Sequence, residues 1–113
     1  MNIKFRNKDF IVTYSRYVGN QRISIALMDD PFIDPSPYLV ATVNLPNEEL
    51  EYNEVAIKNW SENEGILEAL VNADVISSPH REVPVGYTKA YICYINDGLE
   101  LLKHLSTKAE YSQ

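Results

Sequence analysis

Apolar and polar positions alternate along the first quarter of the chain, which predicts β-strands there. The segment FIVTYSRYV, from Phe10, is rich in β-branched and aromatic residues, and RISIALM resumes the alternation up to Met28. Gly19 and Asn20 lie between these segments and can adopt the positive φ angles of a tight turn. We therefore expect a hairpin over residues 10–28, preceded by a short strand, MNIKF, that pairs with the segment beginning at Phe10. The apolar positions expected to face inward are Ile23, Ile25 and Leu27.

The middle of the chain alternates between loops and short strands. DDPFIDPSPY, residues 29–38, holds three prolines, and proline cannot donate to a sheet ladder, so we expect a loop. YLVATVNL then predicts a strand that Pro46 closes. PNEELEYNE is an acidic connection, and EVAIK is the next short strand. The predicted strand YLVATVNL places four residues on one face: Leu39, Ala41, Val43 and Leu45.

A helix is predicted near residues 62–73, within NWSENEGILEALVNADVI. Ser61 and Glu64 match the S-x-x-E capping box, in which each side chain accepts a backbone N–H at the helix start. Gly65 opposes this prediction, because glycine weakens a helix by up to about 1 kcal/mol relative to alanine. Apolar residues at helical spacing form one packing stripe, with the helix ending near Ala73. The members of the stripe are Ile66, Leu67, Leu70 and Val71.

The last third of the chain predicts a loop, a strand and a second helix. The loop carries Pro79 and Pro84, and VGYTKAYICYI is apolar or aromatic on both faces, which favours a central strand. Leu99, Leu102 and Leu105 form the stripe of a helix near residues 98–110. We therefore predict one α+β domain, residues 1–113, in which two helices pack on a mainly antiparallel, twisted sheet of five or six strands.

Cysteine content and hydropathy indicate the cellular compartment in which the protein is expected. Cys93 is the single cysteine, so no internal disulfide can form, and its apolar surroundings favour a buried hydrophobic role. No stretch reaches the roughly 20 apolar residues that a transmembrane helix needs, and the N-terminus lacks a signal peptide's apolar segment. We expect a cytoplasmic protein that does not contact a membrane.

Motifs that carry known chemistry are not recognisable in the sequence. The glycines are scattered, the two histidines lie 24 positions apart, and DDPFID lacks the register of a calcium loop. We therefore expect neither a cofactor nor a metal site. One alternative stays open, in which the chain is a small ligand-binding domain or enzyme with a site at His80, Arg81 and Glu82, which could present an imidazole, a guanidinium and a carboxylate together.

Acidic residues concentrate in the middle of the chain. The net charge is −6. Residues 29–74 hold eleven carboxylates and one basic residue, a net charge of −10, whereas residues 1–28 hold five basic residues and one acidic, a net charge of +4. The overall negative charge disfavours direct binding to nucleic acid.

Two interpretations of this acidity compete. In the first, the carboxylates only solvate loops and a helix start. In the second, they converge on one rim and attract a protein with a basic surface, which makes the chain a non-enzymatic protein-binding module. A structural adaptor that self-associates into a homo-oligomer through a sheet edge is a further alternative. The candidate partner-binding residues are Asp29, Asp30, Asp34, Glu48, Glu49, Glu51, Glu54, Glu62 and Glu64.

A resemblance adds a biological setting. The segment ATVNLPNEELEYNEVAIKNWSENEGILEALVNADVI, followed downstream by VPVGYTKAYI, resembles a domain-of-unknown-function family of small proteins from phages and conjugative elements of Gram-positive bacteria. The shared pattern covers residues 41–95 and includes N-L-P, N-E-V, I-K and S-E-N-E-G-I. It brings no catalytic residues. It implies a mobile-element accessory protein in a bacterial cytoplasm, a setting in which small acidic inhibitors of host defence also occur. In an extreme form of the second interpretation of the acidity, the chain mimics nucleic-acid phosphates and inhibits a nucleic-acid-binding protein.

Overall fold

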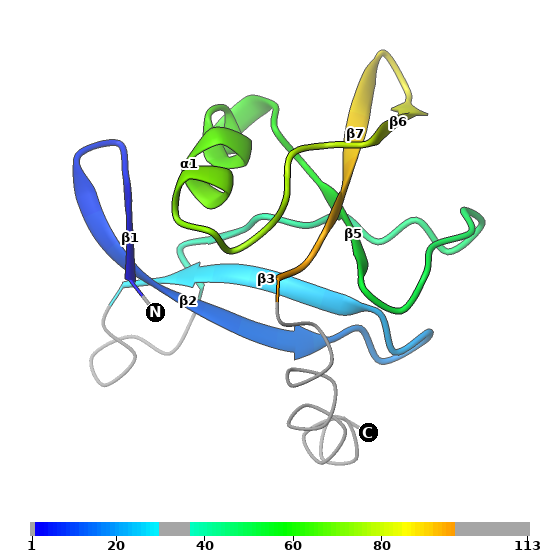
Figure 1. Ribbon diagram of the computed structural model, residues 1–113, viewed down its shortest axis with the longest axis horizontal. Helices are drawn as coiled ribbons and strands as arrows, with labels where there is room; N and C mark the ends of the chain where they lie inside the picture. Colours follow the sequence, from blue (N-terminus) through cyan, green and yellow to red (C-terminus); the bar gives the residue numbers. More distant parts are fainter. Residues whose placement is uncertain (1, 30–36, 97–113) are drawn as a thin grey trace.

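The computed structural model describes residues 2–29 and 37–96, and these fold into two antiparallel sheets and one α-helix (Figure 1). Four strands form the first sheet in the order β1 (Asn2–Phe5), β2 (Lys8–Arg16), β3 (Ile23–Met28) and β4 (Leu39–Val40). The second sheet has the order β5 (Glu54–Ile57), β7 (Thr88–Tyr94) and β6 (Arg81–Val85). The α+β class is confirmed, but a single sheet of five or six strands was the wrong prediction. The predicted helix near 98–110 lies outside the described residues.

The N-terminal strands pair as predicted, but the hairpin turn has another geometry. Arg16 pairs with Ile23 across the hairpin, and β1 pairs with β2 through a two-residue turn. In the hairpin turn the positive φ angle, 62°, belongs to Gln21 and not to Gly19 or Asn20. Tyr17 closes this wider turn, since its N–H donates to the Arg22 carbonyl at 2.8 Å and its carbonyl accepts from the Gln21 N–H at 2.9 Å.

Residues 41–43 join the two sheets. The Ala41 N–H donates to Ile25 in β3, while the Ala41 carbonyl accepts from Lys58, just beyond β5. Thr42 forms an isolated bridge with Ile57. The predicted strand YLVATVNL is therefore only partly correct, because Leu39 and Ala41 enter the main core whereas Val43 and Leu45 pack on a second apolar cluster.

The main core lies between the two sheets and α1 (Ile66–Asn72). Figure 1 shows α1 and the second sheet on the same side of β2 and β3. Side chains from all three units meet there and are almost fully buried, which excludes water from the space between the layers. They include Ile25, Leu27, Val55, Ile57, Ile66, Leu70 and Cys93. The inward orientation of Ile23, Ile25 and Leu27 is confirmed.

The start of α1 differs from the predicted capping box. Ser61–Asn63 form a short 3-10 helix, and α1 begins only at Ile66, after Gly65 at φ 95°. The N-cap residues of the two helices, Trp60 and Gly65, form no side-chain capping hydrogen bond. Instead, the Asn59 Oδ1 accepts hydrogen bonds from the backbone N–H groups of Gly65 at 3.1 Å and Leu67 at 3.0 Å. The helix ends at Asn72 with Ala73 as its C-cap, which agrees with the predicted end near Ala73.

The second sheet contains a strand that the sequence did not predict. β7 is the central strand, as expected, but Pro84, assigned to a loop, lies in β6. β6 is at the edge of this sheet, where proline is tolerated because fewer backbone N–H groups need a partner. Gly86, at φ 59°, and Tyr87 connect β6 to β7, so the central strand begins at Thr88 and not at Val85.

Candidate functional site

The predicted acidic residues fall into separate parts of the fold. Asp30 and Asp34 lie outside the described residues, and Asp29 follows β3. Residues 45–53, here called the acidic loop, carry three of the candidate carboxylates and lead into β5, which begins with Glu54. The two remaining glutamates, at positions 62 and 64, precede α1. Figure 1 shows α1 and the acidic loop on opposite sides of β5.

Several of these carboxylates have a basic partner. The Lys8 Nζ lies 2.7 Å from Asp29, and the Lys58 Nζ lies 2.7 Å from Glu62. Hydrogen bonds, first from Lys58 and then from the backbone and Ser61, lower the pKa of Glu62 from 4.5 to about 2. The described part of the chain holds no ion-pair partner for three others, whose side chains are exposed to solvent: Glu49, Glu51 and Glu64.

Two arginines, one next to the first sheet and one in the second, hold the backbone of the acidic loop. Arg22, immediately before β3, donates to the carbonyls of Leu45 (2.5 Å) and Glu48. Arg81, the first residue of β6, donates to the Glu49 carbonyl at 2.7 Å and to the Glu48 carboxylate at 3.1 Å. Because guanidinium donors contact three successive parts of the loop, its backbone is fixed relative to both sheets.

Glu54 ties the other end of the loop to β6. Its carboxylate accepts the Glu51 N–H at 2.8 Å and lies 2.6 Å from the His80 Nε2, with the side chain 7% exposed. The His80 ring stacks on Tyr94 with centroids 4.1 Å apart. Burial alone raises the pKa of Glu54, but hydrogen bonds from Glu51 and His80 and the charge of Arg81 outweigh it, so the pKa is lowered from 4.5.

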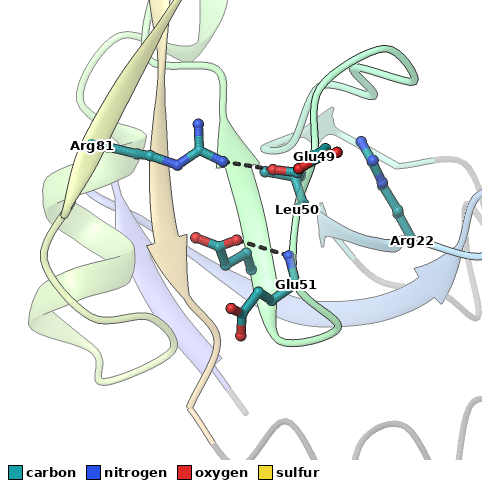
Figure 2. A pocket seen from close by; sticks show the side chains of 6 residues that line it. Arg22, Glu49, Leu50, Glu51 and Arg81 are labelled. Atoms are coloured by element: carbon teal, nitrogen blue, oxygen red, sulfur yellow. Dashed lines mark hydrogen bonds between the residues drawn. The ribbon is translucent and has the colours of Figure 1, made fainter.

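An open pocket of about 580 Å³ lies between the acidic loop and β6 (Figure 2). Figure 2 shows Arg81 reaching toward the loop from one side, while Arg22 lies on the other side of it. The lining residues are Arg22, Glu49, Leu50, Glu51, Glu54 and Arg81. The lining is thus dominated by charged side chains, of which Arg22, Arg81 and Glu54 are held by hydrogen bonds to the loop backbone.

The alternative site at His80, Arg81 and Glu82 is divided by the fold. Arg81 lines the pocket, and His80 bonds to the lining residue Glu54. Glu82 instead pairs with Lys89 at 3.0 Å on the neighbouring strand. Among the residues that the structure describes, no three His, Cys, Asp or Glu side chains are placed to hold a metal ion.

Sequence reasoning missed the role of Arg22. The sequence shows it only as one basic residue of an alternating strand, 23 and 26 positions from the carbonyls that it binds. No local pattern reports such a contact, because it depends on how the two sheets are joined. Cys93, by contrast, is buried as predicted, and burial raises the pKa of its thiol from 9.0 to about 12.

Comparison with known proteins does not assign a family or a function to this chain. Within residues 2–29 and 37–96, no helix combines the length and the apolar character needed to span a lipid bilayer. No protein-family model, no curated protein and no solved structure matches the chain.

Proposed function

We propose that this chain is a non-enzymatic protein-binding module that recognises a basic surface of a partner protein through its acidic loop. Glu49 and Glu51 are the proposed contacts. Glu48, which is paired with Arg81, and Glu54, which is buried, hold the loop in place and are not expected to touch the partner. The sequence resemblance suggests the setting of an accessory protein from a mobile element, in which the partner is a nucleic-acid-binding protein of the bacterial host.

The observation that carries this proposal is the way the loop is held. Arg22 binds the backbone carbonyls of Leu45 and Glu48, and Arg81 binds the Glu49 carbonyl together with the neighbouring Glu48 carboxylate. The two cations therefore order the loop without forming ion pairs with Glu49 or Glu51. A loop that is ordered before binding loses less conformational entropy on association, which favours recognition by the side chains that remain exposed.

Electrostatics supports the same surface. Glu49 and Glu51 are exposed and two positions apart, and together with Glu48 and Glu54 they outnumber the neighbouring Arg22 and Arg81 by four charges to two. A local negative field of this kind accelerates encounter with a positively charged partner and weakens as salt is added. Glu64, just before α1, and Glu68, within it, are also exposed. They serve as a comparison because they carry the same charge on another part of the surface.

The test compares two variants with equal net charge. Host proteins are captured on the wild type, on Glu49→Gln/Glu51→Gln, and on Glu64→Gln/Glu68→Gln, at increasing salt concentration. We expect a partner that the wild type and the α1 variant retain and that the loop variant loses at lower salt. Equal retention by all three proteins at every salt concentration would overturn the proposal.

A further inference from the structure

An apolar depression adjoins the acidic loop. The outer face of the second sheet carries a small apolar cluster, in which Ala56, Val83, Ala90 and Ile92 are buried. The residues that cover this cluster are themselves only partly buried: Val43, Leu45, Leu50, Trp60 and Val85. Where the loop meets β6, the cover is incomplete and leaves a depression of about 180 Å³. Its lining is Leu45, Pro46, Asn47, Glu48, Val83 and Pro84.

The loop backbone that carries Glu49 is held in place relative to the depression. Leu45 and Glu49 are four residues apart in one loop, and the carbonyls of both accept arginine hydrogen bonds. Pro46 and Pro84, both exposed, have φ angles fixed by their rings. An apolar recess therefore stands beside a negative rim on a surface that needs little rearrangement to bind.

We propose that the partner presents an amphipathic basic segment, in which an apolar side chain fills this depression while neighbouring lysines or arginines pair with Glu49 and Glu51. This inference rests on the proposed function and names the chemistry of the partner. The apolar contact supplies affinity that salt does not screen, and the charged contacts supply steering and register.

Charge complementarity favours this occupant over a second copy of the chain. A symmetric dimer places the same surface of each copy against the other, so two acidic loops would meet. Glu49 and Glu51 of one copy would then face the like-charged residues of the other, which disfavours the contact. A basic segment is attracted to these glutamates and is not repelled.

Synthetic probes test the inference before any natural partner has been identified. Fluorescent peptides that alternate lysine with leucine are compared with peptides that alternate lysine with serine, which carry the same charge. Burial of one leucine side chain stabilises by about 1.5–3 kcal/mol, so we expect roughly 10- to 100-fold tighter binding of the leucine peptide. Pro84→Ser should weaken binding of the leucine peptide at least about threefold and leave binding of the serine peptide unchanged. Pro79→Ser, at an exposed proline outside the depression, is the matched control.

The outcomes separate this inference from the function on which it rests. Equal binding of the two peptides, or no binding of either, overturns the apolar contact. If the Glu49→Gln/Glu51→Gln variant nonetheless loses its captured partner, the acidic-loop function stands alone. A dimer in solution that Pro84→Ser converts to a monomer would assign the depression to a second copy and overturn the inference as well. Circular dichroism confirms that each variant is folded before binding is measured.

Discussion

The carboxylate of Glu54 lies 2.6 Å from the His80 Nε2 and accepts the Glu51 N–H with its other oxygen. One buried side chain therefore connects the start of β5, the segment before β6 and the acidic loop. Glu54 and His80 are 26 positions apart, so their contact forms only when the second sheet has assembled. Both the stability of this sheet and the order of the loop depend on it.

Replacing Glu54 with alanine should destabilise the fold. The change removes a buried acceptor and leaves the Glu51 N–H and the His80 ring without it in a partly buried place, which costs about 1–3 kcal/mol. Urea denaturation measures the free energy of unfolding. Glu82→Ala removes an exposed glutamate paired with Lys89 and should cost less than about 1 kcal/mol. Similar losses in the two variants would contradict the role assigned to Glu54.

Stability should fall at acidic pH in a way that depends on Glu54. The pKa of Glu54 is lowered from 4.5 in the folded protein, so its contribution is complete above about pH 4.5 and is lost as pH falls through the folded pKa. In Glu54→Gln this contribution is absent at every pH. The difference in unfolding free energy between wild type and variant should therefore shrink as the pH falls below about 4.5. A difference that persists unchanged at about pH 3 would argue against the lowered pKa.

Gly65 should not tolerate a side chain. Its φ of 95° is unfavourable for residues with a Cβ, and we expect Gly65→Ala to cost about 1–2 kcal/mol. Crowding contributes little, because an added Cβ would lie 3.6 Å from the Phe5 Cε1, an ordinary contact. Gly19→Ala is the control, since Gly19 has no positive φ and no atom within 4 Å of an added Cβ. Thermal unfolding of the two variants should differ clearly, and equal midpoints would refute this explanation.

Asn59, and not Ser61, should support the start of α1. Asn59→Ala removes the acceptor of two backbone N–H groups and should cost about 1 kcal/mol, the usual value of a lost helix cap. Ser61→Ala should change stability by less than about 0.5 kcal/mol, because Ser61 is exposed and caps neither helix. Chemical denaturation decides between the two residues. A larger effect at Ser61 would restore the capping box.

The thiol of Cys93 should react slowly in the folded protein. Burial raises its pKa to about 12, so almost no thiolate exists at neutral pH, and the side chain is inaccessible to reagents. A colorimetric thiol reagent should therefore modify Cys93 fully in denaturant and far more slowly in buffer. Rapid modification of the native protein would show that β7 is not packed as described.

Local patterns in the sequence predicted the strands better than their assembly. Composition rich in β-branched and aromatic residues identified β2, alternation identified β3, and the continuous apolar run identified β7 as a central strand. The short segment EVAIK was also correctly predicted, as β5. The division into two sheets was not predictable, because residues 41–43 bond to β3 and β5 at once, over distances that no local pattern encodes. Pro84 was wrongly assigned to a loop, because proline is excluded from central strands but is tolerated in an edge strand.

At the start of α1 and at the candidate site, too, local sequence patterns did not predict the tertiary contacts. S-x-x-E fits a capping box, but the glycine that follows adopts a positive φ and delays the helix, so Asn59 becomes the acceptor. The acidic residues could be identified from composition alone. Their partners could not, because Lys8 and Asp29 are 21 positions apart and Arg81 and Glu48 are 33. Which carboxylates stay unpaired is decided by the tertiary fold.

The most direct test of the proposed function is the association rate of a captured partner, measured against salt concentration. For the wild type and Glu64→Gln/Glu68→Gln, we expect a fast rate that falls steeply as salt increases. For Glu49→Gln/Glu51→Gln, we expect a slower rate at low salt and a shallower dependence. Identical rates and slopes for all three proteins would contradict recognition through the acidic loop.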